Sequence, residues 1–490
     1  MQYIKSTLLI SICILTSKIL GYIRDTIVAY KIGASIVNDI FIISFKLINL
    51  LRNLAENVLN IIFIPVLSRK TKRDNKDSIL KFLSITHGII IGIISIICFI
   101  IITLIPKIIW NSTIGFREKK EILKIFISFN RILSPYLFCI LIASFYGCIL
   151  NSFNNFFPFA FAPVIFNISN IIFLWILKNI SNTKHILVTT TLLSSVIELI
   201  WMLYFIKYNK LKLKFLKYNF KIHKIFERII IVVLSNLYIH FYIWINIIIL
   251  SFFTGSTSFI YYSERIIYLP VSIIGNAINN VLITLFSKVK KVFSIQEYAI
   301  NLVVILGNIS IYIIYVFSQE IIFFLFEKGN FNNLNTKNTS IILRISTYII
   351  PPIILTKILN VKLYSKMNVI LPYTIIVITT SINISINLIL IYHYKYLAIN
   401  ISNIISIWLN LLILKIKNNI LFSTFIYIEI TKYVISTLLT SLFVLSKKIK
   451  LKYSLNTKII YIMIIKIIIY YIVCYAYNIF VFRKFKSKFN

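Results

Sequence analysis

The sequence has few acidic residues and few charged residues of any kind. Among its 490 residues, Asp and Glu number 14 against 52 Lys and Arg, and charged residues make up only 13%. Hydrophobic residues make up 59%, whereas a soluble domain is only about half apolar and about a quarter charged. The composition therefore excludes an ordinary soluble protein and predicts a polytopic membrane protein.

Cysteine and histidine are scarce, and neither is clustered. The five cysteines are scattered through apolar stretches without a CxxC pair, and the five histidines show no ligand-like spacing. Structural metal sites and disulfide frameworks require such clusters. We therefore expect no metal and no disulfide framework, and we expect the cysteines to pack in the core.

Motifs that carry enzymatic chemistry are also missing. The sequence has no DxD-like pair, no HxxxxD pattern, no glycine-rich phosphate loop and no nucleophile elbow. Membrane transferases need a positioned carboxylate or histidine and usually have sizeable polar loops, while the loops here are short. We expect no enzyme and no cofactor, and the lack of a selectivity-filter loop disfavours a channel.

The net charge of +38 could suggest a nucleic-acid partner, but the hydropathy of the chain outweighs this interpretation. Heavy use of Ile, Asn, Lys, Tyr and Phe is typical of an A/T-rich genome, so part of the charge reflects mutational drift. Individual charged positions therefore count for more than totals, and we expect no nucleic-acid partner.

Long apolar runs predict an all-α integral membrane protein with about fourteen transmembrane helices, because about 20 apolar residues span a bilayer as a helix. A β-barrel would show short alternating segments instead. The first run lacks a small-residue cleavage pattern, so we expect the N terminus to be retained. The predicted spans are 6–30, 38–67, 79–109, 122–150, 157–178, 185–207, 226–253, 259–287, 297–320, 339–363, 369–391, 396–414, 420–446 and 458–482.

Basic loops predict the topology. With an inside N terminus, loops such as 68–76, 207–224 and 287–291 lie inside and carry roughly twice the Lys and Arg of the outside loops. Both termini are then cytoplasmic. The loop 207–224 acts mainly as a topology determinant, and contact with anionic lipid headgroups is the alternative.

An internal repeat predicts the domain organisation. Placing "SFKLINLL" (44–51) over "SERIIYLP" (263–270) aligns Lys46 with Arg265, and the spans after "LNSFNN" (150–155) and "LYSKMN" (363–368) also correspond. Chance similarity in an Ile-rich sequence is the alternative explanation. The predicted parts are a six-helix bundle at 1–207, a basic cytoplasmic loop at 208–225, a second six-helix bundle at 226–416, and two further helices with a basic tail at 417–490.

Several charged residues fall inside the predicted spans, where each costs about 2.5–3.5 kcal/mol on insertion scales. Asp25 and Glu264 lie beside arginines, and Glu56 lies one helical turn after Arg52. One hypothesis is that buried ion pairs fix helix packing. The other is a central cationic cavity between the bundles for an anionic substrate, because the planar fork of arginine suits a diphosphate. The charges in question are Lys18, Arg24, Asp39, Lys46, Arg52 and Arg265.

The segment "SKILGYIRDTIVAYKIGASIVNDIFIISFKLINLLRNLAE" (17–56) resembles the N-terminal signature of the MurJ/MviN lipid II flippases of the MOP exporter superfamily. The resemblance extends through 134–169, 261–278, 325–331 and 363–372. It covers most of the first twelve spans, while the last two match only in length and hydropathy.

The resemblance implies an inner-membrane transporter that carries lipid II, the undecaprenyl-diphosphate-linked peptidoglycan precursor, from the cytoplasmic to the periplasmic leaflet. Membrane lipids are further implied contacts, with a lipid groove within 420–482, and cell-wall synthases stay open as partners. A flippase for another polyprenyl-linked saccharide and a drug exporter of the same superfamily are the alternatives. The implied substrate-binding residues are Lys18, Arg24, Asp39, Arg52 and Arg265, and the secondary candidates are Lys46, Asn49, Glu264, Asn383 and Asn387.

The sequence departs from the family pattern at several positions. Lys18 stands where arginine is usual, Asn53 stands where a second arginine often follows Arg52, and Tyr268 replaces a frequent acid. Some relatives bind sodium, but no acid accompanies Asn383 and Asn387, so we expect no sodium site. We expect alternating access driven by the membrane potential, which suffices without ATP.

Overall fold

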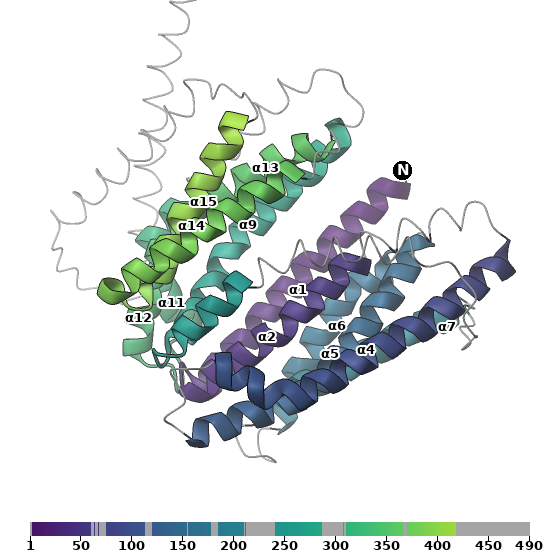
Figure 1. Ribbon diagram of the computed structural model, residues 1–490, viewed down its shortest axis with the longest axis horizontal. Coiled ribbons are helices and arrows are strands. Elements are labelled where there is room, and N and C mark those ends of the chain that lie inside the picture. Colours follow the sequence, from purple (N-terminus) through teal and green to yellow (C-terminus); the bar gives the residue numbers. More distant parts are fainter. Residues whose placement is uncertain are drawn as a thin grey trace, which may run out of the picture. The chain divides into compact units, whose positions relative to one another are not determined.

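The computed structural model describes residues 2–59, 75–112, 120–153, 155–177, 185–209, 241–286, 310–365 and 370–417, with single residues 63, 67, 211 and 307. Throughout these residues the regular structure is helical and contains no strand (Figure 1). The predicted spans 420–446 and 458–482 lie outside the described residues, as does most of the basic loop 208–225. The described part confirms the predicted all-helical class.

The first of two compact units contains the described residues of Met1–Tyr262, Leu325–Thr339 and Ile384–Ile399. Its first six helices correspond in order to the first six predicted spans, since each apolar run is long enough to cross a bilayer. They are α1 (Gln2–Ile32), α2 (Ile36–Val58), α4 (Lys76–Ser112), α5 (Lys120–Ser152), α6 (Phe157–Ile176) and α7 (Ile186–Tyr208).

Helix α5 is the central helix of this unit, because α2, α4 and α7 all pack against it (Figure 1). Helix α6 packs against both α7 and α1. The side chains of Phe126, Phe129, Tyr136 and Phe145 on α5 are fully buried. Gly147 makes a close approach possible, because a Cβ atom there would lie 2.0 Å from the Phe159 ring of α6. Small residues and van der Waals packing hold helices together in a membrane.

Prolines interrupt the hydrogen-bond ladders of several long helices, among them Pro135 in α5, Pro163 in α6 and Pro270 in α9 (Ser256–Phe286). A proline lacks the N–H that would bond to the carbonyl four residues earlier. In α5 the Ser134 hydroxyl donates to this carbonyl, that of Arg131, at 2.8 Å. The side chain therefore satisfies the acceptor that Pro135 leaves open.

The second unit contains the described residues of Ser263–Phe324, Ser340–Asn383 and the chain from Asn400 onward. Helices α9, α11 (Ser318–Phe326), α12 (Asn333–Ser346), α14 (Ile370–Tyr394) and α15 (Leu397–Lys417) each contribute residues to both units. The other elements of this part of the chain are η4 (Thr347–Ile349) and α13 (Ile350–Ser365).

The predicted span 339–363 is not one continuous α-helix. It contains the end of α12, the 3-10 turn η4 and most of α13, and the break lies just before Pro351 and Pro352. These prolines cannot donate to the carbonyls of the preceding turn. Within this unit, Trp408 Nε1 instead donates to the Tyr348 carbonyl oxygen at 3.1 Å, which is the acceptor that Pro352 leaves open.

Among the described residues, seven helical segments are long and apolar enough to cross a membrane. Helices α1, α2 and α9 are not among them, although they have 31, 23 and 31 residues. These three helices carry Arg24, Asp39, Arg52 and Arg265. These four charged candidates therefore lie on helices outside the apolar set.

Candidate functional site

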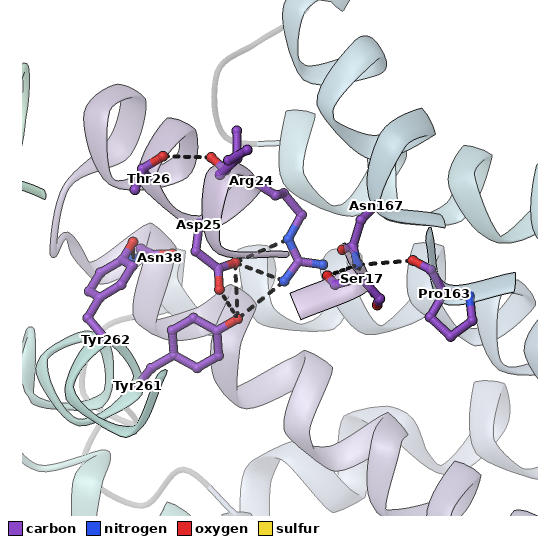
Figure 2. Close-up of polar contacts among 10 residues, drawn as sticks. Ser17, Arg24, Asp25, Thr26, Asn38, Pro163, Asn167, Tyr261 and Tyr262 are labelled. Atoms are coloured by element: carbon purple, nitrogen blue, oxygen red, sulfur yellow. Dashed lines mark hydrogen bonds and ion pairs between the residues drawn. The ribbon is translucent and has the colours of Figure 1, made fainter. Parts of the chain in front are cut away.

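Arg24 and Asp25 on α1 form a buried ion pair that Tyr261 of α9 completes (Figure 2). Arg24 donates to Asp25 Oδ1 from Nε at 3.1 Å and from Nη2 at 2.8 Å. Nη2 also lies 3.5 Å from the Tyr261 hydroxyl, which donates to the Asp25 carboxylate at 3.3 Å. The carboxylate neutralises the guanidinium, and the phenol joins α1 to α9.

A small cavity adjoins this cluster. It measures about 20 Å³ and is lined by Arg24, Asp25, Asn38, Asn170 and Thr191, among others. Such a volume holds about one water molecule. A diphosphate is larger than this volume.

The part of α1 near Lys18 is held against α6 by Asn167. The amide of Asn167 donates to the Ser17 carbonyl oxygen and to the Pro163 carbonyl oxygen, each at 3.0 Å (Figure 2). Gly21 lies against the same amide. The Lys18 side chain is partly buried on this helix.

Asp39 and Asn38, in the first turn of α2, bind the N-terminal end of α9. The fully buried Asp39 carboxylate accepts from the backbone N–H groups of Gly255 and Ser258 and from the Ser258 hydroxyl. The Asn38 amide donates to Ser258 Oγ at 3.1 Å and to the Tyr262 hydroxyl at 3.0 Å. A carboxylate is favourable at a helix N terminus, where N–H groups lack partners.

In this structure the Asp39 carboxylate caps α9. The physical reason is that two backbone N–H groups and a hydroxyl converge on it and satisfy the buried charge.

Arg52 forms a second cluster between α2 and α5. Its Nε donates to Glu56 Oε1 at 2.7 Å, one turn along α2, as the sequence spacing predicts. Its Nη1 lies 3.4 Å from the Tyr136 hydroxyl, which donates to Asn49 Oδ1 at 3.1 Å. The Ser144 hydroxyl donates to Glu56 at 2.8 Å. The structure therefore brings Asn49 and Arg52 into one network.

Glu198 on α7 lies near the same cluster and is not among the candidates predicted from the sequence. Its side chain is buried, and it interacts electrostatically with Arg52 and Glu56. The signal was present in the sequence, since Glu198 is an acid inside the apolar span predicted at 185–207. Tyr136 and Tyr261 gave no comparable signal in a chain with 30 tyrosines.

Three further candidates lie on α2 and α9. Lys46 is partly buried on α2, and Glu264 and Arg265 are partly buried in the second unit. Arg265 follows Tyr261 by four positions, so the two share a face of α9.

The two asparagines of α14 have separate partners. Asn383 donates to Ser406 at 2.9 Å and Asn387 donates to Asn246 at 3.0 Å. Among the described residues, no group of three His, Cys, Asp or Glu side chains could hold a metal ion.

Comparison with known proteins identifies the family. The family model described as "Lipid II flippase MurJ" matches residues 28–479. This chain belongs to the lipid II flippase MurJ family. Two relatives, each named "Probable lipid II flippase MurJ", come from Buchnera aphidicola subsp. Baizongia pistaciae and Buchnera aphidicola subsp. Schizaphis graminum. They are 29% and 30% identical over 425 and 428 residues, in each case 84% of this chain and 83% of the relative.

Solved structures of a MurJ protein and of a MATE transporter have a fold similar to that of this chain. The structure described as "Lipid II flippase MurJ, inward closed conformation" matches with a TM-score of 0.81 at 21% identity, covering 98% of this chain and 99% of the other. An inward-facing multidrug resistance MATE transporter of the MOP superfamily matches with a TM-score of 0.68 at 16% identity, covering 82% and 94%. With its apolar helices, the chain is a multi-pass protein of the bacterial inner membrane.

Proposed function

We propose that this protein translocates lipid II, the polyprenyl-diphosphate-linked peptidoglycan precursor, from the cytoplasmic to the periplasmic leaflet. Membership in the MurJ family supports this proposal, as do the relatives named for the same activity. The observation that carries it is the pair of arginines, Arg24 and Arg52, each held by a carboxylate inside a membrane-spanning unit. Two such cations at bilayer depth suit an anionic headgroup.

The arginines would bind the substrate by exchanging partners. In the structure the Arg24 guanidinium bonds to Asp25 and that of Arg52 bonds to Glu56. A diphosphate offers the same charged oxygen acceptors, so each guanidinium can turn to it with two parallel hydrogen bonds. Lys18 would add a further positive charge, and Arg265 would add one from the face of α9 that also carries Tyr261.

Asp39 would act at a gate rather than on the headgroup itself. Its bonds to Gly255 and Ser258 hold the start of α2 to the start of α9. Breaking these bonds would let the two helix ends separate, which alternating access between the two leaflets requires. Asp39 thus biases the equilibrium between open and closed states.

The polyprenyl tail would stay among the membrane lipids while the headgroup crosses, and the membrane potential would drive the step without chemistry at the substrate.

Both termini would lie in the cytoplasm. We propose no enzymatic activity and no cofactor. Cell-wall synthases would receive the product on the periplasmic side.

A flippase for another polyprenyl-linked saccharide, or a drug exporter, is the second candidate. The fold shared with a MATE transporter supports it. Lipid II translocation by the purified protein in vesicles separates these possibilities, because a drug exporter would leave lipid II in its original leaflet.

Complementation of a flippase-depleted bacterium tests the charged site. Arg24→Ala, Arg52→Ala and Arg265→Ala should each abolish growth while the protein still inserts. Arg131→Ala is the matched control, because Arg131 is an exposed arginine on α5. Growth with all three site variants would refute the role of these arginines.

A further inference from the structure

Glu198 is a buried carboxylate that the proposed mechanism does not yet use. It lies near the middle of α7 and is 6% exposed. An ionisable side chain at bilayer depth is costly to insert and usually faces a partner or a functional cavity. The surroundings of Glu198 therefore indicate what it does.

The titratable groups near Glu198 come from two other helices. Arg52 and Glu56 on α2 interact with it electrostatically, and so do Tyr136 and Cys139 on α5. Helix α6 also packs against α7, but it has no titratable side chain between Phe157 and Ile176. The local charge is thus one guanidinium and two carboxylic acids.

The two acids differ in how they are attached to the site. Glu56 lies on the same helix as Arg52, at the i, i+4 position, so its bond to the guanidinium moves with α2. Glu198 lies on α7, and both α2 and α7 pack against α5. The attraction between Glu198 and Arg52 therefore depends on how these helices are arranged, while that of Glu56 does not.

We propose that Glu198 is a positioning residue that competes with the substrate diphosphate for Arg52 and draws the guanidinium back when the substrate leaves. This inference rests on the proposed function. Because two anions compete for one guanidinium, each weakens the binding of the other. Glu198 would thereby weaken substrate binding and speed release on the far side of the membrane.

Substitution of Glu198 gives a result that a purely structural residue would not give. Glu198→Gln removes the charge and keeps the shape, so the affinity of the full-length protein for farnesyl diphosphate should rise about fivefold or more. The maximal rate of lipid II translocation in proteoliposomes should fall, because release becomes slower. Glu198→Asp keeps the charge and should return both quantities toward wild type.

The measurements are titration calorimetry on the purified protein and a translocation assay on the same preparation. Glu121→Gln is the matched control, because Glu121 is an exposed acid at the start of α5 in the same unit. Glu198→Met supplies a second neutral side chain, of similar length and well suited to the bilayer, in case the glutamine variant does not fold.

Tighter binding together with slower turnover supports the proposal. Unchanged or weaker binding in whichever neutral variant folds overturns it, since a merely structural carboxylate would produce that result. Wild-type protein that neither binds the diphosphate nor moves lipid II refutes the proposed function itself. The two failures are therefore distinguishable.

Discussion

Asp39 and Ser258 are joined by two hydrogen bonds, although 219 positions separate them in the chain. The Asp39 Oδ1 atom accepts from the Ser258 backbone nitrogen at 2.8 Å and from the Ser258 hydroxyl at 2.6 Å. The carboxylate acts as an N-terminal cap for α9, although it belongs to another helix. This contact holds the starts of two charged helices together.

Replacing Asp39 by Asn should destabilise the protein more than replacing Ser258 by Ala. The asparagine amide presents N–H donors where the carboxylate accepts from Gly255 and Ser258, so at least one buried N–H loses its acceptor. The expected loss is about 1–3 kcal/mol, against about 1 kcal/mol for Ser258→Ala, which keeps the backbone bond. Melting temperatures of the purified variants check this order, and an Asp39→Asn protein as stable as Ser258→Ala contradicts it.

Gly33 and Gly329 form a tight contact between the α1–α2 turn and the α11–α12 turn. Their φ angles are +66° and +61°, and a Cβ atom would lie 2.4 Å from the Asn330 carbonyl oxygen and 2.3 Å from the Tyr30 carbonyl oxygen, respectively. The Asn330 N–H donates to the Tyr30 carbonyl oxygen at 3.0 Å. Each glycine is required both by its backbone conformation and by the neighbouring main chain.

Gly33→Ala and Gly329→Ala should each cost about 2 kcal/mol or more, from backbone strain and the displacement of a main-chain oxygen. The yield of monodisperse protein and its melting temperature measure the effect. Gly92→Ala on α4 is the control, because a Cβ there meets nothing within 4 Å. Alanine at position 92 should be neutral or stabilising by up to about 1 kcal/mol. Equal stability of all three variants would disprove the tight contact.

Tyr261→Phe should weaken the Arg24–Asp25 cluster without disturbing its surroundings. The substitution removes the hydroxyl that lies 3.5 Å from Arg24 and 3.3 Å from Asp25 but keeps the ring contact with Tyr262. The expected cost is about 1 kcal/mol. Thermal unfolding of the purified variant measures it, with Tyr204→Phe as the control because Tyr204 is exposed on α7.

Arg24→Lys should reduce lipid II translocation more than Tyr261→Phe does. A lysine ammonium cannot reproduce the hydrogen bonds that Nε and Nη2 both make to Asp25. The initial rate in proteoliposomes measures the loss. A lysine variant with the wild-type rate would show that charge alone is sufficient at this position.

Translocation should respond to the membrane potential. A diphosphate carries about two negative charges, and an inside-negative potential of 100 mV favours outward movement by about 2.3 kcal/mol per charge. A potassium gradient with valinomycin sets the potential in proteoliposomes that contain the protein in one orientation. Translocation that is independent of the potential would remove it as the driving force.

Short-range features of the site could be predicted from the sequence. Asp25 follows Arg24 directly and Glu56 follows Arg52 by one turn, and the structure confirms both ion pairs. The break in the predicted span 339–363 also has a sequence signal in Pro351 and Pro352. These features depend only on residues within about one helical turn.

Long-range partners could not be predicted in the same way. The Tyr136 hydroxyl of α5 lies 3.4 Å from Arg52 Nη1 of α2, and Glu198 of α7 interacts electrostatically with the same arginine. Which face of α5 meets α2 and α7 depends on the packing of bulky side chains against one another, and a predicted span does not specify that face.

The sequence by itself determined that this protein is an all-helical membrane protein of the MurJ family with charges inside its spans, because hydropathy, helical spacing and a local signature are properties of consecutive residues. Only the tertiary structure decided what those charges contact: Asp39 caps α9, and the Arg52 guanidinium meets the Tyr136 hydroxyl of α5 as well as Glu56 of its own helix. A buried charge must find partners wherever packed helices place them, and those partners lie far away in the sequence.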